Sequence, residues 1–392
     1  MTPAARAAAA IGVLDAVLAG APAEEALLRW SRGARYAGSG DRAAVRDLVF
    51  DGLRGLRSLS WSAGAPEPSG RAVILGKIVA QGIDPASIFS GEGHAPAALG
   101  AAELAAIGRL GAAPEAVAMD LPDWLLDPMR AALGDRLAQV MAAARDRAPV
   151  YLRVNRLKSD LPRAVEALAA DGIVAEPEGE ALRVSPNASK IKGSRAYLEG
   201  LVELQDRSSQ EAVAALGGLS GARVLDYCAG GGGKSLALAA LGARVTAHDA
   251  QPARMRDLPA RAVRAGAKIA LARTDALAGR TFDMVLVDAP CSGSGTWRRT
   301  PDAKWRLTSG RLADLVALQA RILDEAAPHV GPGGRLGYMT CSVLLDEDEP
   351  QIAAFLARHP DFRLDRQTRY PADPAATGGD GFFSALLSRV GP

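Results

Sequence analysis

The chain is poor in cysteine and carries no excess of either charge. Its three cysteines, Cys228, Cys291 and Cys341, lie far apart and form no C-x-x-C pair, so we expect no zinc site and no bound metal. An odd and sparse set also argues against a disulfide framework and favours a reducing compartment, so a cytoplasmic location is expected. Arg6 and Asp15 interrupt the apolar N-terminal segment, which predicts neither a signal peptide nor a membrane span there.

The overall charge does not identify a partner. Lys and Arg total 46 against 44 Asp and Glu, and the net charge of +2 neither requires nor excludes nucleic acid, because a sum hides local patches. Hydrophobic residues at 48% and charged residues at 23% are typical of a soluble globular chain. A length of 392 residues is enough for two or three domains.

Two smaller domains are expected ahead of a larger one. Residues 1–145 are predicted to be all-helical, with Asp41 as a helix N-cap and a break at 63–69. Their clearest helical spacing lies at 3–20, 41–60 and 100–108. Residues 146–200 are predicted to form a small α/β unit. Its expected strand, helix and strand are 150–158, 161–172 and 181–186.

Residues 201–392 are predicted to form a doubly wound α/β sheet, because strand-like and helix-like segments alternate there. Helices are expected at 252–265 and 309–327, and a last strand at 382–390. The other strand candidates are 222–228, 243–249, 268–275, 282–290 and 335–341.

A glycine-rich loop follows the first of these strands. The loop D-Y-C-A-G-G-G-G-K-S lets the backbone approach a ligand closely, and the N–H groups of the next helix face that ligand. The residues expected to contact it are Cys228, Ala229, Gly230, Gly231, Gly232, Gly233 and Lys234. A P-loop is disfavoured because Cys228 stands where its first glycine is needed. The pattern leaves a dinucleotide and S-adenosylmethionine as alternatives.

Carboxylates are predicted at the ends of the next strands. Asp249 lies about 20 residues beyond the loop, where an acid can meet ribose hydroxyls. Asp275 and Asp288 are expected to close the third and fourth strands, where they suit an adenine amino group and a substrate base. We therefore predict that all three contact the cofactor.

Cys291 and Cys341 are expected at neighbouring strand ends, on the ligand-binding edge. Carbon 5 of cytosine is a poor nucleophile, but a thiolate that adds to carbon 6 makes carbon 5 reactive toward a methyl donor. A second group must then help to release the enzyme, and Asp288 is a candidate proton donor at the base. The pattern predicts covalent pyrimidine chemistry without deciding which cysteine attacks.

The motifs D-Y-C-A-G-G-G-G-K, L-V-D-A-P-C-S-G-S-G-T, R-R-T-P-D-A-K-W and Y-M-T-C-S-V-L-L-D-E-D-E resemble those of the RsmB/Sun family of RNA cytosine-5 methyltransferases. The resemblance implies S-adenosyl-L-methionine as cofactor and RNA as partner. It assigns attack to Cys341, product release to Cys291 and an active-site contact to Lys234. The family loop usually reads C-A-A-P-G-G-K, and here Gly230-Gly231 replaces Ala-Pro, which removes the stiffening that proline gives a turn.

RNA contacts are predicted in two basic segments. The resemblance makes 146–200 an RNA-binding subdomain, and 42–54 resembles the NusB-like domain of the bacterial ribosomal RNA members, which makes 1–145 a helical RNA-binding domain. The residues expected to touch RNA are Arg298, Arg299, Lys304, Trp305, Arg306, Arg153, Asn155 and Arg156.

Methylation of a cytosine in ribosomal RNA by a monomeric enzyme is therefore the leading hypothesis. Transfer RNA is the alternative substrate. A non-catalytic RNA-binding assembly factor that keeps the fold is the alternative outside enzymes, and a dehydrogenase would not need two strand-end cysteines.

Overall fold

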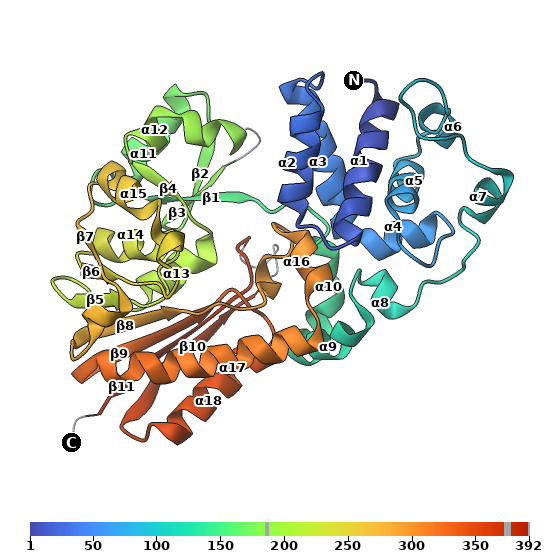
Figure 1. The fold of residues 1–392 in the computed structure, drawn as a ribbon. Coiled ribbons are helices and arrows are strands. Elements are labelled where there is room, and N and C mark those ends of the chain that lie inside the picture. Colours follow the sequence, from blue (N-terminus) through green and yellow to red (C-terminus); the bar gives the residue numbers. More distant parts are fainter. Residues whose placement is uncertain (185–187, 372–377, 391–392) are drawn as a thin grey trace. The chain divides into compact units, whose positions relative to one another are not determined.

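The computed structural model describes residues 1–184, 188–371 and 378–390 and divides into two units (Figure 1). The helical unit comprises Met1–Ala148 and Thr296–Thr308, and the α/β unit comprises Pro149–Gly295 and Ser309–Pro392. Within the described ranges, no helix combines the length and apolar character needed to cross a bilayer.

The helical unit confirms the prediction of an all-helical N-terminal region. Its helices are α1 (Pro3–Leu18), α2 (Ala23–Gly33), α3 (Ser39–Arg54), α4 (Leu56–Ser62), α5 (Gly70–Ala80), α6 (Pro85–Ile88), α7 (Ala101–Ala106), α8 (Glu115–Ala118), α9 (Leu126–Leu133) and α10 (Leu137–Ala143). The helix predicted at 41–60 is interrupted at Gly55. Asp41 is not the N-cap but the third residue of α3, where its carboxylate accepts from the Gly38 N–H and pairs with Arg6.

The helical unit also contains a segment that the sequence placed within 201–392. Helix α16 (Pro301–Arg306) packs on α3, where the Trp305 indole donates to the Leu53 carbonyl at 2.7 Å. The Arg54 guanidinium donates to the Arg298 carbonyl at 2.9 Å. Because these partners are about 250 residues apart in sequence, no local pattern could predict their contact.

The α/β unit begins with a four-stranded antiparallel sheet of order β2-β3-β1-β4. The elements are β1 (Val150–Val154), α11 (Leu161–Ala170), β2 (Ala175–Glu178), β3 (Ala181–Val184), α12 (Arg195–Leu198) and β4 (Val202–Leu204). The predicted strand, helix and strand are present, although the end of the second strand candidate lies outside the described residues. Strand β4 was missed because it has only three residues, and β2 because its sequence A-E-P-E contains a proline and two glutamates in place of apolar residues.

The main sheet has seven strands in the order β10-β11-β9-β8-β5-β6-β7. They are β5 (Arg223–Asp226), β6 (Arg244–Ala247), β7 (Ile269–Leu271), β8 (Phe282–Asp288), β9 (Val330–Thr340), β10 (Phe362–Tyr370) and β11 (Phe382–Arg389). Strands β5 to β9 pair in parallel, whereas β10 and β11 pair antiparallel. This confirms the predicted doubly wound sheet. Strand β10 was missed because five consecutive residues in it are exposed, four of them charged or amide side chains.

Helices pack around this sheet and bury two apolar clusters. They are α13 (Arg207–Ala214), α14 (Gly233–Ala240), α17 (Ser309–Ala326) and α18 (Glu349–Arg358), while α15 (Leu258–Ala265) packs with α14 in a third cluster. Side chains of β8 enter both clusters, as its alternating residues require: Val285 belongs to one and Leu286 to the other. The buried core therefore fixes the carboxyl ends of β5, β8 and β9, where the polar residues gather.

Candidate active site

The glycine loop joins β5 to α14 and lies directly against α15. Gly232 is the residue before α14 and has a φ of +82°, a left-handed conformation that favours glycine. A Cβ at this position would lie 2.1 Å from a methyl group of Leu258 on α15. Both the backbone conformation and this close approach therefore require glycine here.

Asp249, predicted to contact the cofactor, lies beside this loop. Its carboxylate accepts from the Gly230 N–H at 3.0 Å and from the Gln251 N–H at 2.9 Å. Arg254 also pairs with it at 3.3 Å. The structure thus brings Asp249 to the predicted site. Its carboxylate binds backbone N–H groups both of the glycine loop and of the turn that follows its own strand.

Asp275 does not close the third strand as predicted, because β7 already ends at Leu271. Asp275 belongs instead to a short 3-10 turn, and its side chain is 80% exposed. It lies 3.6 Å from Arg273. Its contact with a cofactor stays a prediction.

Asp226 is a functional candidate that sequence reasoning missed. It ends β5 and is fully buried, and Ser235 donates to its Oδ2 at 2.6 Å. Burial raises the pKa of Asp226 to about 7, although the Ser235 hydrogen bond opposes the shift. Its Oδ1 has no hydrogen-bond partner among the described residues, which makes it an acceptor available to a ligand. The feature of the sequence that could have identified Asp226 is its position at the end of a strand, just before the glycine loop.

The structure brings together the four residues predicted to be catalytic. The sulfur atoms of Cys291 and Cys341 are 3.4 Å apart. Lys234 Nζ lies 2.7 Å from Asp288 Oδ2 and 5.1 Å from the centre of the Phe382 ring. Burial of Lys234 disfavours its charge, but attraction to Asp288 outweighs it, and the pKa of Lys234 is raised. Lys234 is therefore an ammonium group, held close to the two thiols.

The two cysteines lie in different electrostatic surroundings. The pKa of Cys291 is raised well above its usual value by its hydrogen bond to Cys341, by burial and by the negative charges of Cys341 and Glu347. A negative charge on Cys341, in contrast, interacts favourably with Lys234. This arrangement keeps Cys291 a thiol and places the cation of Lys234 where it interacts with Cys341.

Glu347 holds the loop that carries Cys291. Glu347 is buried in a 3-10 turn before α18. Its carboxylate accepts from the Ser292 N–H at 2.8 Å, the Ser292 hydroxyl at 2.5 Å and the Gln319 amide at 2.9 Å. No local pattern marks this role, because the partners are 55 and 28 residues away.

The next residue, Asp348, holds the strand that carries Cys341. The Thr340 hydroxyl, one residue before that cysteine, donates to Asp348 Oδ1 at 2.9 Å. Burial raises the pKa of Asp348 to about 8, although the Thr340 hydrogen bond and the charge of Arg369 oppose the shift. Glu347 and Asp348, two neighbouring acids, therefore hold the segments that carry Cys291 and Cys341.

We expect Asp348→Asn to remove a pH dependence from folding stability. The native protein holds a proton on Asp348 up to about pH 8, whereas the unfolded chain releases it near pH 4, so the native state loses stability between these values as pH rises. At pH 9 the variant should melt about 3 °C or more above wild type, and at pH 3, below both pKa values, the two should melt together. The control is Asp346→Asn at an exposed neighbour. Equal melting at both pH values would contradict the assignment.

Several residues predicted to touch RNA point inward instead. Asn155 is 1% exposed, and its amide donates to the carbonyls of Gly200 and Ala265 at 2.7 Å each. Arg153 is also buried, and it donates to Gln205 at 2.7 Å. Arg156 is exposed, as a contact with RNA requires, and pairs with Glu180. Asn155 and Arg153 thus serve the packing of the α/β unit.

The second predicted RNA segment lies largely within the helical unit. Arg298 and Lys304 are buried, and Trp305 packs against the helical core. Burial lowers the pKa of Lys304 to about 8, partly offset by Asp120. Arg306 is exposed and Arg299 partly so. Within this segment, only these exposed side chains are placed as the prediction of RNA contact requires.

Two families match the chain. The family described as 16S rRNA methyltransferase RsmB/F matches residues 213–388, and the RsmF/B-like ferredoxin-like domain matches residues 121–188. The ribosomal RNA small subunit methyltransferase B of Erwinia tasmaniensis is 39% identical over an alignment of 284 residues, and this alignment covers 68% of this chain and 66% of that protein. The protein of the same name from Serratia proteamaculans is 35% identical over an alignment of 288 residues, which covers 69% of this chain and 66% of its own length.

Solved structures share the fold. The structure titled PH0851 superposes with a TM-score of 0.76, at 24% identity and over 99% of both chains. NSun6 from Pyrococcus horikoshii with SFG has a TM-score of 0.62 at 17% identity, over 69% of this chain and 99% of that one. These likenesses confirm the predicted architecture of a methyltransferase sheet.

Proposed function

Because this chain belongs to the RsmB/F family of methyltransferases, we propose that it transfers a methyl group from S-adenosyl-L-methionine to carbon 5 of a cytosine in ribosomal RNA. The observation that carries this proposal is the pair of thiols 3.4 Å apart, beside the ion pair of Lys234 and Asp288 at the sheet edge. Methyl transfer to an oxygen or nitrogen atom does not need a thiol pair, whereas carbon 5 of a pyrimidine needs covalent activation.

The residues at the glycine loop fit the proposed cofactor. S-adenosylmethionine carries an ammonium group and ribose hydroxyls, which are hydrogen-bond donors. Asp226 Oδ1 is a buried acceptor without a partner among the described residues, and Asp249 lies across the loop from it. The cofactor supplies an electrophilic methyl group, and the acids of this chain are proposed to hold and orient it.

Cys341 is proposed to attack carbon 6 of the base as a thiolate. Lys234 stabilises that thiolate as a neighbouring cation and, as an ammonium group, can protonate the base edge. Asp288 orients Lys234 through their 2.7 Å contact. The proton therefore resides on Lys234, which makes Lys234, rather than Asp288 as the sequence suggested, the proposed donor.

Cys291 is proposed to act after methylation. A base must take the proton from carbon 5, so that its electron pair forms the double bond between carbons 5 and 6 while the bond to carbon 6 breaks and Cys341 leaves as a thiolate. Cys291 lies beside Cys341 and is held by Ser292, which the carboxylate of Glu347 fixes. This placement supports a role for Cys291 in release of the product.

Label transfer tests the proposal. The protein is incubated with methyl-labelled S-adenosylmethionine and either unmodified 16S rRNA or unmodified transfer RNA, and the digested nucleosides are separated. We expect label in 5-methylcytidine from 16S rRNA. Label confined to transfer RNA would give the enzyme the alternative substrate. No label in either RNA would contradict the enzymatic proposal and favour a non-catalytic RNA-binding factor.

A further inference from the structure

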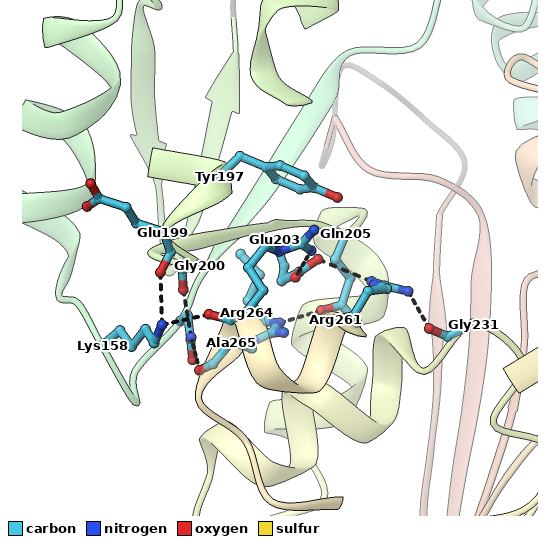
Figure 2. A network of polar contacts seen from close by, with 12 residues as sticks. Lys158, Tyr197, Glu199, Gly200, Glu203, Gln205, Gly231, Arg261, Arg264 and Ala265 are labelled. Atoms are coloured by element: carbon cyan, nitrogen blue, oxygen red, sulfur yellow. Dashed lines mark hydrogen bonds and ion pairs between the residues drawn. The ribbon is translucent and has the colours of Figure 1, made fainter. Parts of the chain in front are cut away.

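We propose that Arg261 is a positioning residue that holds the cofactor loop where glycine replaces the family's proline. The proposal rests on the proposed cofactor and concerns how this chain orders its loop to bind it. Arg261 lies on α15, and one of its terminal nitrogens donates to the carbonyl of Gly231 (Figure 2). The bond grips the loop at one of the two positions where its sequence departs from C-A-A-P-G-G-K.

Arg261 is itself held in place by a buried carboxylate. Its other terminal nitrogen lies 3.1 Å from Glu203 Oε2 on β4, and Glu203 is 1% exposed. Arg264, one turn further along α15, pairs with the other oxygen of Glu203 and lies 4.0 Å from the centre of the Tyr197 ring. Because both carboxylate oxygens bind an arginine of α15, the Arg261 side chain has a fixed direction toward the loop.

The end of α15 is anchored to the four-stranded sheet by Lys158 and by Asn155, which the sequence suggested for RNA. Asn155 donates to the Ala265 carbonyl at 2.7 Å, and Lys158 donates to the Arg264 carbonyl at 2.7 Å and to that of Glu199 at 3.0 Å. These donors satisfy carbonyls that a helix leaves free at its C-terminus. The basic segment 153–158 thus anchors the helix that carries Arg261.

The loop needs such a brace because its own sequence does not restrict it. Four consecutive glycines, Gly230 to Gly233, have more backbone freedom in the unbound state than a sequence with proline, and binding must remove that freedom. The Gly231 carbonyl bond fixes the loop before a ligand arrives. A bond from a side chain on α15 therefore replaces a covalent restriction within the loop.

Two features of position 231 agree with a proline there. The φ angle of Gly231 lies outside the left-handed region, and among the described residues its N–H donates to no protein acceptor. A Cβ there would meet the tip of Arg261 at 3.3 Å, and the variant that lacks this side chain removes the contact. Gly231→Pro can therefore substitute for Arg261 if the arginine acts by ordering the loop.

The test measures the Kd for S-adenosylmethionine by calorimetry and hydrogen exchange of the loop amides without ligand. We expect Arg261→Ala to weaken binding about tenfold and to speed exchange of the loop amides. Arg256→Ala is the matched control, because Arg256 is 86% exposed just before α15 and faces Asp257. Adding Gly231→Pro to Arg261→Ala should recover most of the lost affinity. If Arg261→Ala melts early, Arg261→Lys carries the same test, because one ammonium group cannot reproduce the two-sided contact.

Unchanged loop exchange in Arg261→Ala would overturn the proposal, and so would a loss of affinity that Gly231→Pro leaves unrepaired. These outcomes are distinct from a failure of the proposed function. If the wild-type protein does not bind S-adenosylmethionine, the proposed function is contradicted, while the exchange measurement still decides whether Arg261 orders the loop.

Discussion

Replacing Cys341 by serine should abolish methyl transfer, with a loss of about a thousandfold or more. A serine hydroxyl ionises far less readily than a thiol, so the variant has almost no anionic nucleophile near neutral pH. Lys234 interacts favourably with a negative charge at this position. The variant loses this interaction because its serine carries no negative charge. The measurement is the single-turnover rate of label transfer to RNA.

The binding controls separate chemistry from folding in this variant. Cys341→Ser should melt like wild type and bind the cofactor with unchanged affinity, because one sulfur atom is replaced by a smaller oxygen at a half-buried position. Retention of more than a tenth of the wild-type rate in a folded variant would show that Cys341 is not the nucleophile.

Cys291→Ser should convert the enzyme into a trap for its own substrate. Attack by Cys341 and methylation can proceed, but release is slowed, so a covalent complex of protein and RNA accumulates. We expect a band of lower mobility on a denaturing gel that forms only with RNA and cofactor present. The hydrogen bond to Cys341, burial and the charge of Glu347 raise the pKa of Cys291, which fits a residue that does not attack the base.

The reversed pattern has a definite meaning. If Cys291→Ser is inactive without an adduct while Cys341→Ser accumulates one, the two roles are exchanged. The double variant should form no adduct, because its nucleophile is absent, and it therefore shows whether the shifted band depends on a cysteine.

The sheet and its catalytic edge were predictable because their signals are local. The glycine loop, the strand-end acid Asp288 and the two cysteines each follow an apolar strand within a few residues. Parallel strands bring such positions to the same edge of the sheet. The positions of Cys291 and Cys341 after their strands were therefore enough to predict that the two residues lie together. The family resemblance added the substrate and the order of the two thiols.

The remaining features depend on contacts between distant residues. In the sequence Glu347 stands among the acids at a helix start, and only the fold brings Ser292 to it. Asn155 likewise stands in a basic strand, and only the fold places the end of α15 beside it. Lys304 likewise appears as an RNA contact in the sequence, whereas α16 buries it in the helical unit. Charge pattern alone cannot distinguish a side chain that meets solvent from one that meets a carbonyl.

RNA that carries 5-fluorocytidine at the target position tests the covalent mechanism most directly. Fluorine takes the place of the hydrogen on carbon 5 and cannot leave as a cation. The bond from the enzyme to carbon 6 therefore persists after methylation. Mass spectrometry of the digested complex from wild-type protein should find the modified nucleotide on the peptide that contains Cys341. A modified Cys291 peptide, or no covalent complex in the presence of cofactor, would contradict cytosine-5 methylation through Cys341.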